Sequence, residues 1–188
     1  SSINVISNVQ TQGNPPTTTF NNSNIDPQVG CPWRDSVAAF GRALVFANST
    51  GVYALYGGAA EKVSSALDGL FASATFNTNE PGGVTPSAAV ATIFGIRCYC
   101  LLLTTINPYT NEQETFMCCW DGQKWFPANQ IQDIAFLGSE EIDSELMAWG
   151  NDGTDLFPLF QEPSEVLEKV FQTKLRSDPA YVYGKQVN

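Results

Sequence analysis

Apolar residues in this chain come in short runs of strand length, and the runs are separated by turn-forming residues. The clearest case is the pair of runs at 43–47 and 52–56, which flank the tetrapeptide Asn-Ser-Thr-Gly at 48–51. Glycine readily takes the positive φ that a tight turn between antiparallel strands needs. The pattern therefore predicts a β-hairpin over residues 43–56.

The same kind of hairpin recurs twice, around Asp-Gly dipeptides at 121–122 and 152–153. Strands are expected at 36–40, 42–48, 52–56, 60–64, 89–94, 97–106, 115–120, 124–127, 133–137, 145–149 and 156–160, with an acidic loop at 138–144. Recurrent hairpins indicate repeated sheet units, which we place at about 33–72, 88–130 and 131–176.

The two ends of the chain differ from this pattern. Residues 1–30 are rich in Asn, Thr, Ser, Gln and Pro, with a weak alternation that favours a strand at 3–10. They predict an irregular polar arm or linker that precedes a β domain at 31–188. Residues 163–176 fit either a helix or, over 168–176, a strand, and a further strand is expected at 181–187. The chain lacks an initiating Met, so we expect a piece of a longer protein.

An all-β architecture of small antiparallel sheets arrayed around an axis, a partial or small β-propeller with four-stranded blades, explains these units. The three units, with a further one from the two ends, give about four blades, the low end for a closed ring. A β-sandwich is the structural alternative.

Composition indicates a globular chain, since 43% of its 188 residues are hydrophobic and 12% are aromatic. No apolar run approaches the roughly 20 residues of a membrane span, so no membrane association is expected. The first residues show neither the basic nor the apolar segment of a signal peptide.

The net charge and the absence of His exclude several classes of function. Nine Lys and Arg against 19 Asp and Glu give a net charge of −10, which disfavours binding of nucleic acid but suits a surface that repels passing DNA. The chain has no His, which removes the commonest general base and metal ligand. These facts argue against ordinary hydrolytic or metalloenzyme chemistry, and no cofactor is expected.

The five cysteines do not form a disulfide framework, because their number is odd and their spacing irregular. A zinc site from Cys98, Cys100 and either Cys118 or Cys119 is conceivable, but the spacing fits no zinc pattern. Buried, reduced thiols in a sheet are the simpler interpretation, and they indicate a reducing compartment.

Four segments carry a resemblance to a known family. They are GRALVFANSTGVYALY at 41–56, EKVSSALDGLF at 61–71, FMCCWDGQKWF at 116–126 and GNDGTDLFPLFQEPSEVLEKVFQTK at 150–174. Together they resemble the β-propeller region of tail or virion structural proteins of tailed bacteriophages, over residues 33–178. In that family a strand pair leads into a "K(I/V)S…LDG(I/L)F" segment, and the last blade ends in "TKL". The resemblance is also the reason to favour a strand at 168–176.

The resemblance implies a non-enzymatic part of the virion tail, made in the cytoplasm of the bacterial host. It implies a tail tube or nozzle protein that forms a ring of copies around the DNA path, beside neighbouring tail or portal proteins. The acidic side chains that would line the path are Glu140, Glu141, Asp143, Asp152 and Asp155. Like-charge repulsion would keep DNA from adhering during ejection.

Three other readings remain open. Four tryptophans, Trp33, Trp120, Trp125 and Trp149, serve either assembly and packing or a sugar-stacking surface in a carbohydrate-binding propeller. Paired carboxylates among Asp68, Asp121, Asp133, Glu140, Glu141 and Asp143 would suit a glycosidase, although Asp-Gly pairs are turn formers by type. Asn151, Asp152 and Asp155 are rich in oxygen ligands, but they lack the full calcium-loop pattern.

Overall fold

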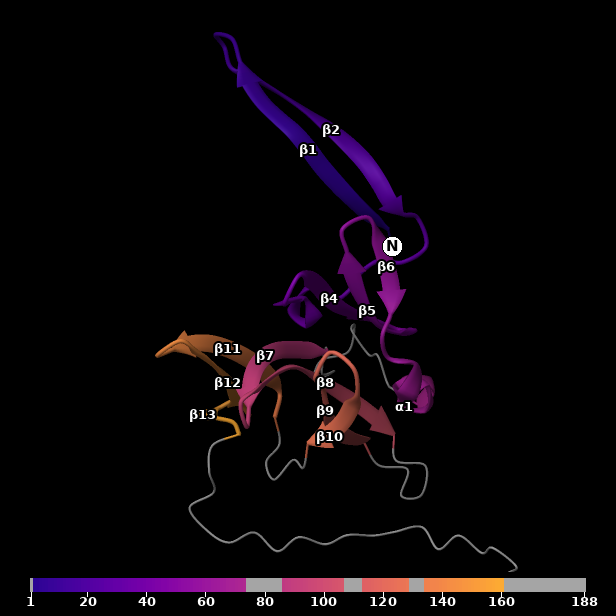
Figure 1. Ribbon diagram of the computed structural model, residues 1–188, viewed down its shortest axis with the longest axis vertical. Helices are drawn as coiled ribbons and strands as arrows, with labels where there is room; N and C mark the ends of the chain where they lie inside the picture. The colour runs from indigo at the N-terminus through magenta and orange to yellow at the C-terminus, as the bar shows by residue number, and fades with distance from the viewer. Residues whose placement is uncertain (1, 74–85, 107–112, 129–133, 161–188) are drawn as a thin grey trace, which may run out of the picture.

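The computed structural model describes residues 2–73, 86–106, 113–128 and 134–160, and almost all of the regular structure in them is β-strand (Figure 1). These residues form four antiparallel sheets, and the predicted all-β class is confirmed. The segments at 163–176 and 181–187, for which the sequence predicted a helix or strands, lie outside the described residues.

The N-terminal arm is a long β-hairpin. Strands β1 (Ile3–Gln12) and β2 (Thr17–Asp26) pair with each other, with an irregularity in register between Ser7 and Gln10. The hairpin projects from the other sheets, and nearly all of its residues are exposed (Figure 1). The arm is thus regular where the sequence predicted irregularity. Strand β2 was not predicted, because its Thr, Asn and Ser residues give no hydrophobic alternation. It forms because pairing with β1 supplies hydrogen-bond partners to its backbone N–H and C=O groups.

The first of the remaining sheets is a meander of β3 (Ala38–Phe40), β4 (Ala43–Asn48), β5 (Gly51–Tyr56) and β6 (Ala59–Lys62). A 3₁₀ turn at Arg34–Ser36 precedes it; a second at Ser65–Leu67 and helix α1 (Asp68–Ser73) follow. Asn48 pairs with Gly51 across the predicted turn, and Gly51 has φ +146°. A Cβ at Gly51 would lie 2.5 Å from the Ser64 Oγ, so close approach also requires glycine here.

The second sheet is a meander of β7 (Ser87–Ile93), β8 (Ile96–Ile106), β9 (Gln113–Trp120) and β10 (Trp125–Ala128). Its central strands are apolar at consecutive positions, as in CYCLLL of β8 and MCCW of β9. Such continuous runs indicate burial on both faces of a sheet.

The third sheet contains β11 (Phe136–Ile142), β12 (Glu145–Asn151) and β13 (Leu156–Pro158), which pair in chain order. The prediction of an acidic loop at 138–144 was wrong, because β11 runs through Glu140 and Glu141 to Ile142. The turn itself is only Asp143 and Ser144, with φ of 52° and 66°. Exposed glutamates are compatible with an edge strand, where charge also prevents unwanted strand pairing.

The second sheet lies between the first and the third. One core cluster joins Val45, Val52 and Ala54 of the first sheet to Tyr99 and Leu101 of the second. Another joins the opposite face of the second sheet to the third, around Cys100, Leu102, Met117, Leu137 and Ala148. The meanders therefore form three packed layers, whereas a sandwich has two.

The first strands of the three sheets, β3, β7 and β11, lie close together in this stack. Strand β7 contacts β3 on one side and β11 and β12 on the other. The described residues contain no sheet closed on itself, so a propeller and the division into three units stay predictions.

Candidate assembly surface

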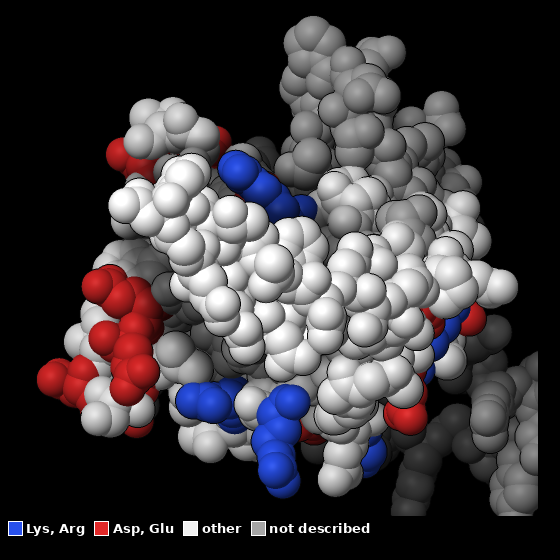
Figure 2. Space-filling model, turned by 90° about the horizontal axis from the view of Figure 1, so that it is seen from above, with Lys and Arg blue, Asp and Glu red and all other residues white. Residues whose placement is uncertain are grey.

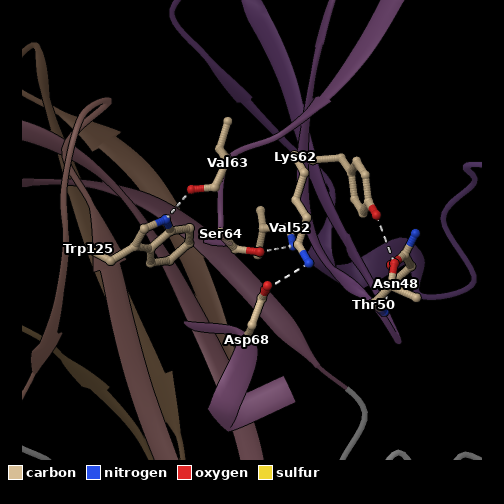
Figure 3. A network of polar contacts seen from close by, with 9 residues as sticks. Asn48, Thr50, Val52, Lys62, Val63, Ser64, Asp68 and Trp125 are labelled. Carbon is tan, nitrogen blue, oxygen red and sulfur yellow. Dashed lines mark hydrogen bonds and ion pairs between the residues drawn. The ribbon is translucent and has the colours of Figure 1, made fainter. Parts of the chain in front are cut away.

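Two hydrogen bonds, one buried and one partly buried, tie the second sheet to the first. The Trp125 Nε1 donates to the Val63 carbonyl at 2.7 Å (Figure 3), and the Tyr99 hydroxyl donates to the Ser36 carbonyl at 2.7 Å. Trp125 also stacks on Trp120, with ring centroids 6.1 Å apart. These contacts fix the position of the second sheet relative to the first. A surface formed by residues of both sheets depends on that fixed position.

The predicted tryptophans mainly serve this packing. Trp33 and Trp120 are 7% and 3% exposed and belong to the core cluster between the first and second sheets. Trp125 and Trp149 are half-buried, and the Trp149 Nε1 has no hydrogen-bond partner among the described residues. Whether any of the four takes part in assembly or sugar binding stays a prediction.

The segment after β6 is held by polar contacts (Figure 3). The Ser64 Oγ accepts a hydrogen bond from the Val52 amide at 2.8 Å, and Lys62 pairs with Asp68 at 2.7 Å. Asp68, a candidate for glycosidase chemistry, is the first residue of α1 and forms an ion pair with Lys62 of β6. This contact gives Asp68 a structural partner.

The acidic side chains predicted to line a DNA path lie at the two ends of one hairpin. Glu140, Glu141 and Asp143 are exposed near the β11–β12 turn, together with Glu145. Figure 2 shows acidic side chains gathered at one edge of the molecule, on the side where β11 and β12 lie in Figure 1.

Asp152 and Asp155 belong to the β12–β13 turn at the far end of β12. Glu141 pairs with Leu146, five residues before Asn151, so the two acidic groups are about 17 Å apart along the strand. The predicted wall is therefore split into two separate patches.

Asp121 and Asp152 occupy equivalent positions in turns of the same design. The Asp121 Oδ1 accepts hydrogen bonds from the amides of Gln123 and Lys124, at 2.8 and 2.7 Å. The Asp152 Oδ1 does the same with the amides two and three residues later, both at 2.8 Å. These backbone donors lower the pKa of both carboxyl groups. Both side chains are thus occupied in closing a turn, as the Asp-Gly pattern predicted.

Four of the five cysteines are buried in the second sheet, and all five are free thiols. The Cys119 Sγ donates to the Cys100 Sγ at 3.4 Å across β8 and β9. Burial raises the pKa of Cys98 and of Cys118 to about 11. Among the described residues, no group of three His, Cys, Asp or Glu side chains is placed to hold a metal ion.

The arm exposes apolar side chains that nothing in the described structure covers. Val5, Ile6, Val9 and Phe20 are all exposed, Ile6 and Val9 at 61%. No residue from 2 to 25 is charged, although the chain as a whole has a net charge of −10. Seen from the arm end, the surface is uncharged over a wide area (Figure 2).

Where the arm meets the first sheet there is a cavity of about 270 Å³. Its lining includes Ile3 from β1, Val37 before β3, and Leu44, Phe46 and Leu55 from β4 and β5. The cavity opens on the face of this sheet that points away from the second sheet. No sequence pattern indicated it, because its walls come from the arm and the sheet together.

A second feature missed from the sequence is Phe94, at the tip of the β7–β8 hairpin. Phe94 and Gly95 form the two-residue turn, with φ of 50° and 78°. The Phe94 side chain is 93% exposed. The Phe-Gly dipeptide between two apolar runs was the available signal, but residues 89–94 were assigned to a strand as a whole.

Comparison with protein-family models, curated proteins and solved structures found no match to this chain. Within the described part of the chain, no helix has the length and apolar character of a membrane span.

Proposed function

We propose that this chain is a non-enzymatic structural subunit of a bacteriophage virion, which assembles with copies of itself as a ring in the tail tube or nozzle. Neighbouring tail or portal proteins are its other partners, and the subunit is made in the host cytoplasm. DNA passes the ring without being bound specifically. The exposed, uncharged arm is the observation that carries the assembly part of the proposal.

The arm requires a partner on physical grounds. An isolated two-stranded hairpin is at best marginally stable in water, because it has no second layer on which to bury apolar side chains. This hairpin also exposes Val5, Ile6, Val9 and Phe20. Covering them against another subunit removes apolar surface from water and adds a layer to the hairpin.

The partner is best explained as another copy of the same chain. Copies with a net charge of −10 repel one another over most of their surface. A contact through the arm avoids that cost because residues 2–25 carry no charge. In a cytoplasmic monomer the apolar side chains of this hairpin would stay in water and contribute no stabilisation by burial.

The stacked sheets support a propeller-like subunit. Two four-stranded meanders and one three-stranded meander follow one another in chain order and pack face to face. The first strands of the three lie together, as the inner strands of propeller blades do. The resemblance of residues 33–178 to phage tail proteins leads to the same architecture.

The carbohydrate-binding alternative is less well supported. A sugar-stacking platform needs exposed aromatic rings, whereas Trp33 and Trp120 are buried between sheets. A glycosidase would need free carboxyl pairs, but among the candidates Asp121 accepts two backbone hydrogen bonds and Asp68 pairs with Lys62.

The assembly proposal is tested by measuring the mass of the native particle. Native mass spectrometry and electron microscopy should show a discrete ring for the parent chain. Replacing Val5, Ile6, Val9 and Phe20 by Thr keeps β-propensity and should reduce assembly without changing the urea midpoint, since these side chains are exposed. A monomer that binds glycans on an array would instead support the alternative.

The DNA-path proposal is tested by neutralising Glu140, Glu141, Asp143, Asp152 and Asp155 to the corresponding amides in assembled virions. Slower or incomplete DNA ejection is expected, because an acidic surface repels the phosphate backbone. Glu61→Gln on the first sheet is the control. Unchanged ejection with all five amides would reject an electrostatic role for these residues.

A further inference from the structure

The tip of the β7–β8 hairpin carries a side chain that the fold itself does not use. Phe94 is 93% exposed and belongs to neither core cluster; Ile93 before it is buried, whereas Ile96, which pairs with Ile93 across the turn, is 54% exposed. The Phe94 backbone has φ 50°, a left-handed conformation that is disfavoured for a bulky residue. The first position of this two-residue turn favours Asn, Asp or Gly. Strained positions of this kind cluster at active sites, ligand clamps and switch regions, so the strain indicates a role other than folding.

The cavity at the base of the arm is a suitable acceptor for an aromatic ring. A cavity of about 150 Å³ lined by Leu, Ile and Phe takes up benzene. The cavity here has about 270 Å³ and is open to solvent; Ile3, Val37, Leu44, Phe46 and Leu55 line it together with Ser2, Asn4 and Cys31. Leu44 and Val37 are 42% and 37% exposed, so the lining is open to an incoming side chain.

We infer that Phe94 of one copy inserts into this cavity on the next copy. The ring of Phe94 is exposed in its own chain, and the cavity lies on the outer face of a different sheet. The tip residues 93–98 include no acidic side chain, and Arg97 is exposed there, so the tip carries no charge that would be repelled by a chain of net charge −10. The inference rests on the proposed self-assembly and specifies the contact that drives it.

Because the tip belongs to the second sheet and the cavity to the first, the proposed contact is head-to-tail. Each copy offers its tip to one neighbour and its cavity to another, so the contact repeats with the same geometry. Such heterologous contacts close into rings when the rotation between copies permits, and otherwise extend into filaments. A self-complementary contact, by contrast, would stop at a dimer.

The decisive variant is Phe94→Asn, because Asn-Gly is the preferred dipeptide for this turn. It removes the ring and relieves the strained backbone, so the thermal midpoint should rise while association weakens about 10- to 150-fold, the loss expected for one buried Phe. Ser144→Gly in the β11–β12 turn is the matched control, since it relieves φ 66° without removing an aromatic ring. The control should leave the mass of the assembly unchanged in sedimentation analysis.

A mixing experiment tests the direction of the contact. Leu44→Glu places a charge at the cavity and should also yield monomers. When the two variants are mixed, the intact Phe94 of one fits the intact cavity of the other, and a heterodimer is expected. Cys31, which also lines the cavity, should react with a thiol reagent more slowly in the assembled parent than in Phe94→Asn.

Several results would overturn the inference. If Phe94→Asn assembles as the parent does, the tip is not the contact, although self-assembly itself stands. If only Leu44→Glu disrupts the ring, another part of the neighbour occupies the cavity. If the parent chain is monomeric at every concentration, both the inference and the proposed ring fail.

Discussion

The hydrogen bond from Tyr99 to the Ser36 carbonyl gives a quantitative test of how the first and second sheets are joined. Tyr99 is fully buried, and its hydroxyl lies 2.7 Å from the acceptor. Burial raises the pKa of Tyr99 well above its ordinary value, so the hydroxyl remains a donor at neutral and moderately basic pH. The substitution Tyr99→Phe removes only this oxygen and retains the ring.

The expected loss in the free energy of unfolding follows from the Ser36 carbonyl, which the substitution leaves without a hydrogen-bond donor. Ser36 is also fully buried, so its carbonyl loses a partner in a place that water does not reach. A buried polar group without a partner costs about 1–3 kcal/mol. For a chain of this size that lowers the thermal midpoint by roughly 2–4 °C per kcal/mol.

Urea unfolding followed by tryptophan fluorescence measures this cost, at a concentration where the chain is monomeric. Tyr53→Phe is the matched control, because the Tyr53 hydroxyl pairs with the Thr50 Oγ1 at 2.8 Å at an exposed site. That change should cost less than about 0.5 kcal/mol. Equal urea midpoints for Tyr99→Phe and the parent would refute the reasoning that this bond joins the sheets.

Three further predictions concern the turns, the third sheet and the thiols. Asp121→Ala and Asp152→Ala should destabilise the chain at pH 7; because the folded pKa of each carboxyl is lowered, the charge-dependent part of this difference in urea midpoint is present above about pH 4 and is lost as pH falls through the folded pKa. Asn at the same positions retains an uncharged acceptor and should show a weaker pH dependence, while a difference that does not shrink at low pH would contradict the assignment. Gly150→Ala should cost about 1–3 kcal/mol in thermal unfolding, because the new Cβ would lie 2.8 Å from the Phe157 ring; an unchanged midpoint would show that the ring moves aside. A thiol reagent should label at most Cys31 in the native monomer and all five cysteines in guanidinium, since the other four are buried; rapid labelling of a second thiol would contradict the described packing.

Local signals predicted the hairpins well, because a tight turn depends on a few adjacent residues. Asn48 to Gly51, Asp121 with Gly122, and Asp152 with Gly153 all lie at turns in the structure. The prediction failed where charge was taken as a sign of a loop. Glu140 and Glu141 lie in β11, since pairing with β12 needs only backbone groups and an edge strand leaves both side chains in water.

The candidate site was less predictable than the strands. Sequence reasoning grouped Glu140, Glu141 and Asp143 with Asp152 and Asp155 by charge, but the length of β12 separates them. It also selected tryptophans by their chemistry, although Trp120 is buried on a face that meets another sheet. The exposed Phe94 was hidden at the end of a predicted strand.

The amino-acid sequence by itself determined the all-β class, the positions of the main hairpin turns and the uncharged character of the arm, because these follow from composition, period and turn chemistry. Only the tertiary structure decided which faces of the sheets are covered. The second sheet is buried on both faces and the arm on neither, a difference that depends on contacts between distant segments. The same is true of the cavity, whose walls come from β1, β4 and β5 and exist only once the arm and the first sheet have met.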